Sequence, residues 1–162
     1  MALTGTQGTG RVSMAIMTEA GTNLAKIESW QVPKLNWTVM SYLDDIATGS
    51  RGKISTEEIL ARIAEGRYHL WVAYTEHTTL AASLVEIEYW PKNYAVLHII
   101  GGAGKNKDIW ATREVVSIIE RWGRNTYGCS SVKVTGRLGW KRVFEAMGYA
   151  ATHIVLEKDI EP

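Results

Sequence analysis

Residues 95–149 decide the fold. They read as an apolar run (AVLHII, 95–100), a glycine-rich run (GGAGKNKD, 101–108), a long amphipathic segment (IWATREVVSIIERWGRNTYG, 109–128), a short apolar run (SVKVTG, 131–136) and a second helical segment (RLGWKRVFEAMG, 137–148). The pattern predicts a strand, a glycine loop, a helix beginning near Asp108, a second strand and a second helix. A strand that leads through glycines into a helix presents backbone N–H groups at the positive helix end, which suits an anion such as a pyrophosphate.

The flanking segments extend this unit. Apolar residues at helical spacing predict helices over 34–47 and 55–66, and Glu58 follows Ser55 at the spacing of a capping box. The runs YHLWVAYT and TLAASLVEIEYW predict an antiparallel hairpin, and ATHIVLEKDI (151–160) predicts a closing strand. Residues 12–17 fit a strand or a helical turn equally well. Residues 1–10 are small, polar and glycine-rich, and we expect a flexible tail there, followed by one domain over 11–162.

Composition narrows the classes of function. The chain has 162 residues, 46% of them hydrophobic, which fits one globular domain. Its net charge of +1 makes a nucleic-acid partner improbable, and no apolar run reaches the roughly 20 residues of a membrane span. Cys129 is the only cysteine, so we expect neither an intrachain disulfide nor a cysteine metal site, and the four histidines have no metal-ligand spacing. The N-terminus lacks the pattern of a signal peptide.

The order of the predicted elements resembles the fold of the GCN5-related N-acetyltransferases (GNAT), over residues 34–160. A short helix that ends on Gly148-Tyr149 before a strand is similar to a motif of that family. The stretches EGRYHLWV (65–72) and TGRLGWKRVFEAMGY (135–149) resemble a GNAT-like group encoded by tailed bacteriophages, commonly among virion and packaging genes. The resemblance implies an α/β (α+β) single domain with a mixed, mostly antiparallel central sheet flanked by helices.

The resemblance also implies where a cofactor binds. In this family the central strand parts from its neighbour and pairs with the pantetheine arm of acetyl-CoA, and the next loop surrounds the pyrophosphate. Transferred to this sequence, the cofactor-binding residues are Ile99, Ile100, Gly101, Gly102, Ala103, Gly104 and Lys105. The family's Arg or Gln at the loop start is missing here and the spacing differs. A tight turn that needs positive φ explains the glycines equally well.

Catalytic residues are harder to place. The family's usual Tyr, four residues before the helix-ending glycine, corresponds to Phe144, which cannot protonate a departing thiolate. The candidates for a base are Glu86 and Glu88, which alternate along one predicted strand, and His98 on the central strand. The alternatives are a solvated sheet face for the glutamates and a hydrogen-bonded core residue for the histidine. No metal site is predicted.

The motif Gly136-Arg137-Leu138-Gly139-Trp140 offers candidate interaction residues. Arg and Trp are enriched in binding sites, so Arg137 and Trp140 are predicted to line a contact surface. The alternative places Trp140 in the core of a strand-to-helix turn, and we favour it for Trp140.

Two functions follow from this resemblance. The first is a GNAT-fold phage protein with blunted catalytic motifs, a structural or interaction component of the virion or its assembly. Its partners would be other virion or assembly proteins, contacted in part through residues 1–10. The alternative is an acetyl-CoA-dependent N-acetyltransferase acting on a protein or small amine, and the sequence leaves open whether the chain is an enzyme. The expected location is the host cytoplasm during infection or the virion, without membrane contact.

Overall fold

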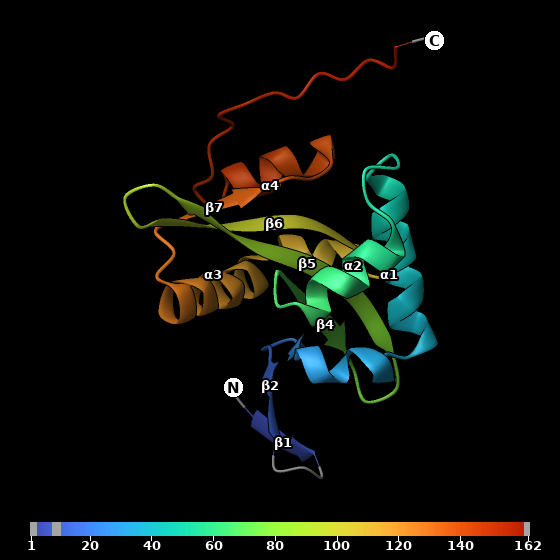
Figure 1. Cartoon of the computed structure of the whole chain (residues 1–162). Helices are drawn as coiled ribbons and strands as arrows, with labels where there is room; N and C mark the ends of the chain where they lie inside the picture. The colour runs from blue at the N-terminus through green and yellow to red at the C-terminus, as the bar shows by residue number, and fades with distance from the viewer. Residues whose placement is uncertain (1–2, 8–10, 161–162) are drawn as a thin grey trace.

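The computed structural model of the protein describes residues 3–7 and 11–160 (Figure 1). Its strands are β1 (Leu3–Gln7), β2 (Arg11–Met17), β3 (Asn23–Ile27), β4 (Tyr68–Tyr74), β5 (Thr79–Trp90), β6 (Tyr94–Gly104) and β7 (Ser131–Val134). Its α-helices are α1 (Trp37–Gly49), α2 (Thr56–Ala64), α3 (Arg113–Tyr127) and α4 (Lys141–Glu145). Three 3-10 helices, η1 (Ser29–Lys34), η2 (Lys107–Ala111) and η3 (Leu138–Trp140), complete the described chain.

The strands form one mixed sheet in sequence order, β1 to β7. Successive strands pair antiparallel as far as β6, and β7 then pairs parallel with β6. The parallel pair follows from α3, because a crossover helix between two strands returns the chain in the same direction. The predicted class, a mixed and mostly antiparallel sheet flanked by helices, is confirmed.

Each face of the sheet has its own apolar core. On one face α1 and α2 pack on β4 and β5, with Leu43 and Leu84 among the residues almost wholly removed from water. On the other face α3 and α4 pack on residues that alternate with those, such as Val85 and Leu97. The alternation follows from the two-residue period of a strand, and it explains why β6 has an almost unbroken apolar sequence.

The helices on the first face begin as the sequence predicts. Asn36 accepts a hydrogen bond from the backbone N–H of Val39 at 2.9 Å and caps α1. Ser55 and Glu58 form the predicted capping box at the start of α2, with bonds of 3.1 and 2.9 Å. These caps satisfy N–H groups that have no partner within the helix.

The connection after β6 differs from the prediction. The glycine-rich run is not a loop, because Gly101 to Gly104 form the last four residues of β6. The helix predicted from Asp108 begins at Arg113, and the 3-10 helix η2 occupies the residues between. A strand tolerates glycine where a neighbouring group approaches closely, and that exception to strand propensity is not visible in the composition.

The ends of the chain also differ. Residues 151–160 form no strand: they follow α4 as an exposed, irregular segment that runs away from the sheet (Figure 1). Their strand-like composition was the reason for the wrong prediction, since local propensity cannot supply a partner. The tail expected at 1–10 contains β1, paired with β2 from Leu3 to Gln7. The rest of that tail lies outside the described residues, and its flexibility stays a prediction.

Candidate functional site

The strands β6 and β7 separate part-way along β6. They pair only from Val96 to Ile99, and the backbone N–H of Thr135 donates to the carbonyl of Ile99 at 3.0 Å, just past the last pair. Beyond Ile99, β6 continues to Gly104 with β5 as its one strand partner among the described residues. We call this opening between Ile100–Gly104 and the end of β7 the fork. It leaves one backbone edge of β6 without a ladder.

A bulge lies at the start of the fork. In the pairing with β5, Gly101 is opposite Leu84 and Ile99 is opposite Val85, so Ile100 is an extra residue. A bulge bends its strand and increases the local twist. The bulge therefore helps to turn Ile100–Gly104 away from β7.

The glycines of the fork have packing reasons. A Cβ at Gly102 would lie 2.6 Å from Cδ1 of Trp110, whose ring covers this position. A Cβ at Gly104 would lie 2.5 Å from the Cα of Ala81, and Gly104 also has a φ of +133°. At Gly101 the nearest atom, of Ile46, would be 3.8 Å away, an ordinary contact. Close packing therefore requires glycine at two of these positions whatever ligand binds.

The two connections that border the fork meet through an ion pair. Asp108 in η2 lies 3.3 Å from Nη2 of Arg137, before η3, and the indole N–H of Trp140 donates to the same carboxylate at 3.5 Å. The guanidinium of Arg137 also lies 5.3 Å from the centre of the Trp140 ring. Trp140 is buried, so the core alternative holds for it, while Arg137 remains half exposed beside the fork.

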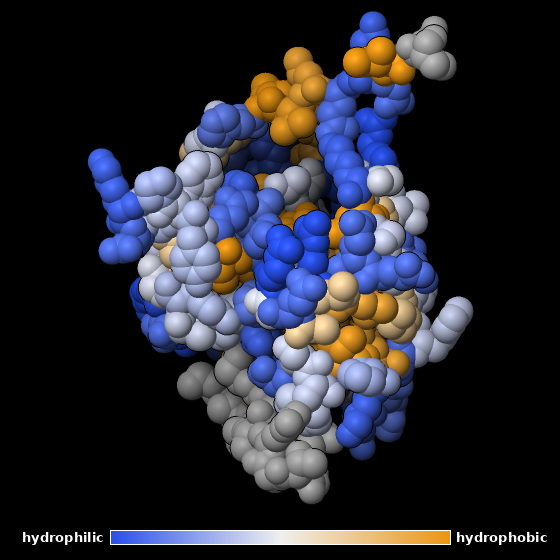
Figure 2. Space-filling view, in the orientation of Figure 1, coloured by the Kyte–Doolittle hydropathy of each residue, from blue (hydrophilic) through white to orange (hydrophobic). Residues whose placement is uncertain are grey.

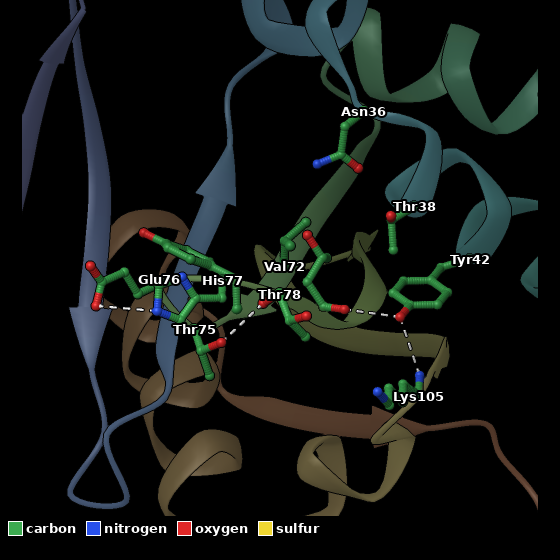
Figure 3. A pocket seen from close by; sticks show the side chains of 11 residues that line it. Asn36, Thr38, Tyr42, Val72, Thr75, Glu76, His77, Thr78 and Lys105 are labelled. Carbon is green, nitrogen blue, oxygen red and sulfur yellow. Dashed lines mark hydrogen bonds and ion pairs between the residues drawn. The ribbon is translucent and has the colours of Figure 1, made fainter.

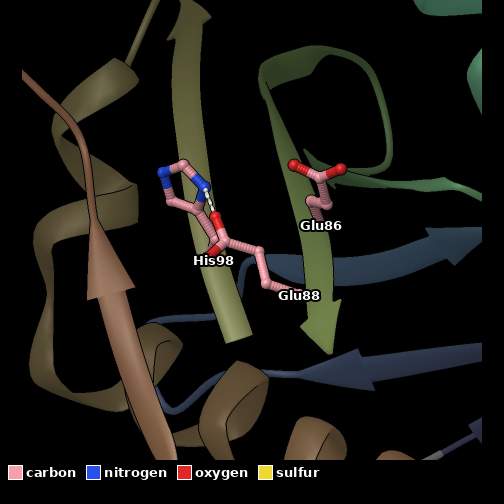
Figure 4. A group of neighbouring side chains, drawn as sticks. All are labelled: Glu86, Glu88 and His98. Atoms are coloured by element: carbon pink, nitrogen blue, oxygen red, sulfur yellow. Dashed lines mark ion pairs between the residues drawn. The ribbon is translucent and has the colours of Figure 1, made fainter. Parts of the chain in front are cut away.

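The three candidate catalytic residues come together on one sheet face (Figure 4). Glu86 and His98 are direct cross-strand partners on β5 and β6. The Nδ1 atom of His98 lies 2.8 Å from Oε1 of Glu88, a close contact without the angle of a hydrogen bond. The ligand atoms of the three side chains lie within 4.8 Å of one another, close enough for one metal ion.

Two residues of β7 and its end complete this cluster. The ammonium of Lys133 donates to Oε1 of Glu88 at 2.7 Å, which already supplies a positive charge to that carboxylate. The hydroxyl of Thr135 lies 2.8 Å from Nε2 of His98. His98 is thus held between Glu88 and Thr135, one residue before the fork opens.

Burial and the charge of Lys133 favour the neutral form of His98. Burial lowers the pKa of His98 below its usual 6.5, and Lys133 lowers it further, while the nearby Glu88 carboxylate acts in the opposite direction. Burial alone would raise the pKa of Glu88, but the hydrogen bond from Lys133 and the charge of Lys133 contribute to lowering it overall. At neutral pH the pair is a carboxylate beside an uncharged imidazole, which is the form a general base requires.

No side-chain acid is placed at the family's usual position. Phe144 is buried, with its ring 5.8 Å from that of Trp140 and 5.1 Å from that of Tyr149. The hydroxyl of Tyr149 donates to Glu120 at 2.5 Å, and burial together with this bond raises the pKa of Tyr149 far above its usual 10.0. Neither residue can readily donate a proton at the fork.

A separate pocket of about 570 Å³ opens beside the β4–β5 turn (Figure 3). Polar groups of α1, the turn and the end of β6 line it, and the Tyr42 hydroxyl bonds there to the carbonyl of Thr79 at 2.9 Å. The backbone N–H of Lys105 lies 3.4 Å from the same hydroxyl. Of the predicted site residues only Lys105 borders this pocket, so it is distinct from the cluster around His98.

The structure thus groups the predicted residues into two sets that meet at the bulge. The catalytic candidates lie beside the part of β6 that pairs with β7. The fork, on the other side of the bulge, is lined by Ile100, Gly101, Gly102, Ala103 and Gly104, and Ile99 is buried where the fork begins. Sequence reasoning missed Lys133, Thr135 and Asp108. No local signal marks them, because only the parallel pairing of β7 with β6 and the ion pair with Arg137 give them a role.

Solved structures give an independent comparison. A GCN5-related N-acetyltransferase from Ralstonia eutropha JMP134 is similar, with a TM-score of 0.61, 13% identity, and coverage of 86% of this chain and 99% of that one. The GNAT-like fold is thereby established. Glucosamine-6-phosphate N-acetyltransferase from Arabidopsis thaliana matches at a TM-score of 0.58 and 18% identity, covering 86% and 99%. A predicted acetyltransferase from Clostridium acetobutylicum, solved with acetyl-CoA, matches at 0.57 and 13%, covering 85% and 96%.

These identities are low enough that the likeness concerns the fold alone. No protein-family model and no curated protein sequence matches the chain. None of the helices in the described part of the chain combines the length and apolar character needed to cross a bilayer. Function must therefore be argued from the GNAT-like fold and from the residues at the fork.

Proposed function

We propose that the chain is an acetyl-CoA-dependent N-acetyltransferase that binds the thioester in the fork and uses His98 as its base. The observation that carries this proposal is the position of the His98–Glu88 pair, one residue before β6 and β7 separate. A base at the closed end of the opening can reach an amine that approaches a thioester lying in it. A solvated sheet face would not need a neutral histidine in contact with a partly buried carboxylate.

The fork has groups that fit such a ligand. The free backbone edge of Ile100–Gly104 can pair with the amides of a pantetheine arm, as a strand does. The indole N–H of Trp110 is buried beside Gly102 and has no hydrogen-bond partner among the described residues, so it would donate to a ligand that reaches Gly102. Lys105, Lys107 and Arg137 can supply positive charge to the phosphates.

The residues around His98 have separate tasks. The thioester supplies the acetyl group, and the acceptor amine loses one proton as it forms the amide. His98 accepts this proton at Nε2, directly or through the hydroxyl of Thr135 that lies 2.8 Å away. Glu88 stabilises the charged imidazolium. Because Phe144 replaces the usual acid, the departing thiolate takes its proton from solvent.

The first test is binding of acetyl-CoA to the purified chain, followed by release of free thiol with a panel of amines and peptides. The proposal predicts saturable binding and acceptor-dependent thiol release, and both should fall in a Gly101→Glu variant, where a Cβ meets only an ordinary contact. Gly49→Glu, at a position with open space around its Cβ, is the matched control. No detectable heat in titration calorimetry at millimolar acetyl-CoA would remove the proposal.

A structural role in a phage particle or its assembly stays a prediction. It rests on the resemblance of residues 65–72 and 135–149, and the exposed aromatic side chains of Tyr89, Trp90 and Tyr94 at the β5–β6 turn fit a contact surface. Of the seven tryptophans in the sequence, Trp71, Trp110 and Trp140 are buried and cannot contribute to such a surface. Finding the protein in purified virions would support this role, and finding it only as a free enzyme would contradict it.

A further inference from the structure

The sheet face that carries α1 and α2 is covered only in part. Leu84 of β5 lies in the core beneath these helices, and Glu86 and Glu88 follow on the same face, because alternate residues of a strand point to one side. In the space-filling view, hydrophilic residues gather over the strands beside α2 (Figure 2). His98 of β6 reaches this face as the cross-strand partner of Glu86. Two carboxylates and one imidazole thus meet on a half-buried part of the sheet.

One nitrogen of His98 is left without a hydrogen bond. Its Nδ1 atom is buried, has no partner among the described residues, and lies 2.8 Å from Oε1 of Glu88 without the angle of a hydrogen bond. On the other side of the ring, Nε2 lies 2.8 Å from the hydroxyl of Thr135 and donates to it when it carries the ring proton. Nδ1 then presents a lone pair beside a carboxylate oxygen. Two such acceptor atoms repel each other unless a cation lies between them.

The distances in this cluster suit ligands around one metal ion. With metal–ligand bonds of about 2.1 Å, neighbouring ligand atoms lie about 3 Å apart and opposite ones about 4.2 Å apart. The distance between Nδ1 of His98 and Oε1 of Glu88 fits a neighbouring pair. All three ligand atoms lie within 4.8 Å of one another, so a small movement of the Glu86 side chain completes the set. A metal-bound histidine ordinarily donates its other N–H, as His98 can to Thr135.

We infer that Glu86, Glu88 and His98 bind a divalent transition-metal ion of the zinc type. One imidazole nitrogen with two carboxylate oxygens suits Zn²⁺ better than Mg²⁺, which prefers oxygen ligands, and three protein ligands leave a position for water. The sequence shows no ligand spacing because the ligands come from two strands that meet only across the sheet. The inference does not depend on the proposed acetyl transfer. An ion at Nδ1 would hold the ring proton on Nε2 and so stop His98 from accepting a proton there.

Lys133 competes with the ion for Glu88. Its ammonium donates at 2.7 Å to Oε1 of Glu88, the oxygen that lies next to Nδ1 of His98. A divalent ion at this carboxylate must displace the ammonium or bind beside it against charge repulsion. The Lys133 side chain is half exposed, so it can turn into solvent. Lys133 should therefore limit the affinity for metal, and removing its charge should raise that affinity.

The test is titration calorimetry of Zn²⁺ into the full chain, expressed without a polyhistidine tag and freed of metal by a chelator. The inference predicts one ion bound per chain, with much weaker binding of Mg²⁺. Binding should weaken at least about tenfold in Glu86→Gln and be lost in His98→Ala. Lys133→Met should bind Zn²⁺ several-fold more tightly than the wild type. Circular dichroism checks that each variant is folded.

A matched control is another glutamate–histidine pair, on the β4–β5 turn. Nε2 of His77 lies 3.9 Å from Oε2 of Glu76, and both side chains are exposed. His77→Ala should leave binding unchanged, because such a pair supplies too few ligands. The visible absorption of bound Co²⁺ is a second readout, expected in the wild type and in His77→Ala but not in His98→Ala. No Zn²⁺ binding by the wild type, binding that survives His98→Ala or is lost with His77→Ala, or a Lys133→Met chain that binds no more tightly would each overturn the inference.

Discussion

The two halves of β6 differ in what they contribute. From Val96 to Ile99 the strand lies between β5 and β7, and its side chains fill the cores or, at His98, join a polar cluster. From Ile100 to Gly104 it pairs with β5 alone and has little side-chain volume. The first half contributes the side chain of His98, and the second half contributes an unpaired backbone edge. The bulge at Ile100 separates the two.

This difference explains why one strand can support both parts of a transfer reaction. A base must be held by neighbours on both sides, and His98 has Glu88 on β5 and Thr135 beyond β7. A backbone edge that receives a ligand must have no neighbour on that side. Substitutions in the first half should therefore alter the rate of transfer, and substitutions in the second half should alter stability or ligand binding.

The largest effect is expected from Gly104→Ala in the second half. Its Cβ would overlap the backbone of Ala81, and φ is +133° there, so we expect a loss of about 3 kcal/mol of unfolding free energy. Gly101→Ala, with ordinary contacts only, should cost less than about 1 kcal/mol. Urea denaturation of both variants measures the contrast. Equal losses would mean that close approach is not what requires glycine in this half.

In the first half, His98→Ala should abolish most of the transfer without weakening binding of acetyl-CoA. General-base catalysis contributes at least about a hundredfold, so kcat/KM should fall by about that factor. His77→Ala, which changes an exposed histidine on the β4–β5 turn, should leave the rate unchanged. Steady-state kinetics and calorimetry on the same samples separate the two effects, and a His98→Ala enzyme with full activity would place the base elsewhere.

The neighbours of His98 should shift its titration in opposite directions. Activity should rise with pH through the lowered pKa of His98 and be level above 6.5, because the base works uncharged. Glu88→Gln removes a group that raises this pKa, so the midpoint should move to lower pH. Lys133→Met removes a group that lowers it, and the midpoint should move to higher pH. Titration of the His98 ring by NMR checks both, and shifts of the same sign would contradict the assigned contacts.

The smallest effect is expected at the border of the fork. Asp108 competes with an anionic ligand for Arg137, and this exposed ion pair is worth at most about 1 kcal/mol. Asp108→Asn should therefore tighten binding of CoA by a few-fold, and Arg137→Gln should weaken it. Calorimetry with CoA measures both changes. Weaker binding in Asp108→Asn would show that the carboxylate has another role.

The sequence was sufficient for the elements whose signals are local. Helical spacing and the Ser55–Glu58 box predicted α1 and α2, and residue type alone selected Glu86, Glu88 and His98. The glycines of β6 were read as a loop, because the reason for them is the close approach of Trp110 and Ala81 from elsewhere in the chain.

Pairing between distant segments was the main limit. Lys133 and Thr135 enter the cluster only through the parallel pairing of β7 with β6, which no local pattern reveals. Residues 151–160 have the composition of a strand but form none, because composition does not supply a strand to pair with.

The most direct test of the fork as the ligand site is hydrogen exchange of the β6 amides with and without CoA. Bound pantetheine should slow exchange at those backbone N–H groups of Ile100–Gly104 that point into the fork, while the amides of Val96–Ile99, where β6 lies between β5 and β7, should change little. Protection that appears in the second half of β6 alone is the result we predict. Binding of CoA that leaves Ile100–Gly104 unprotected would contradict the central claim.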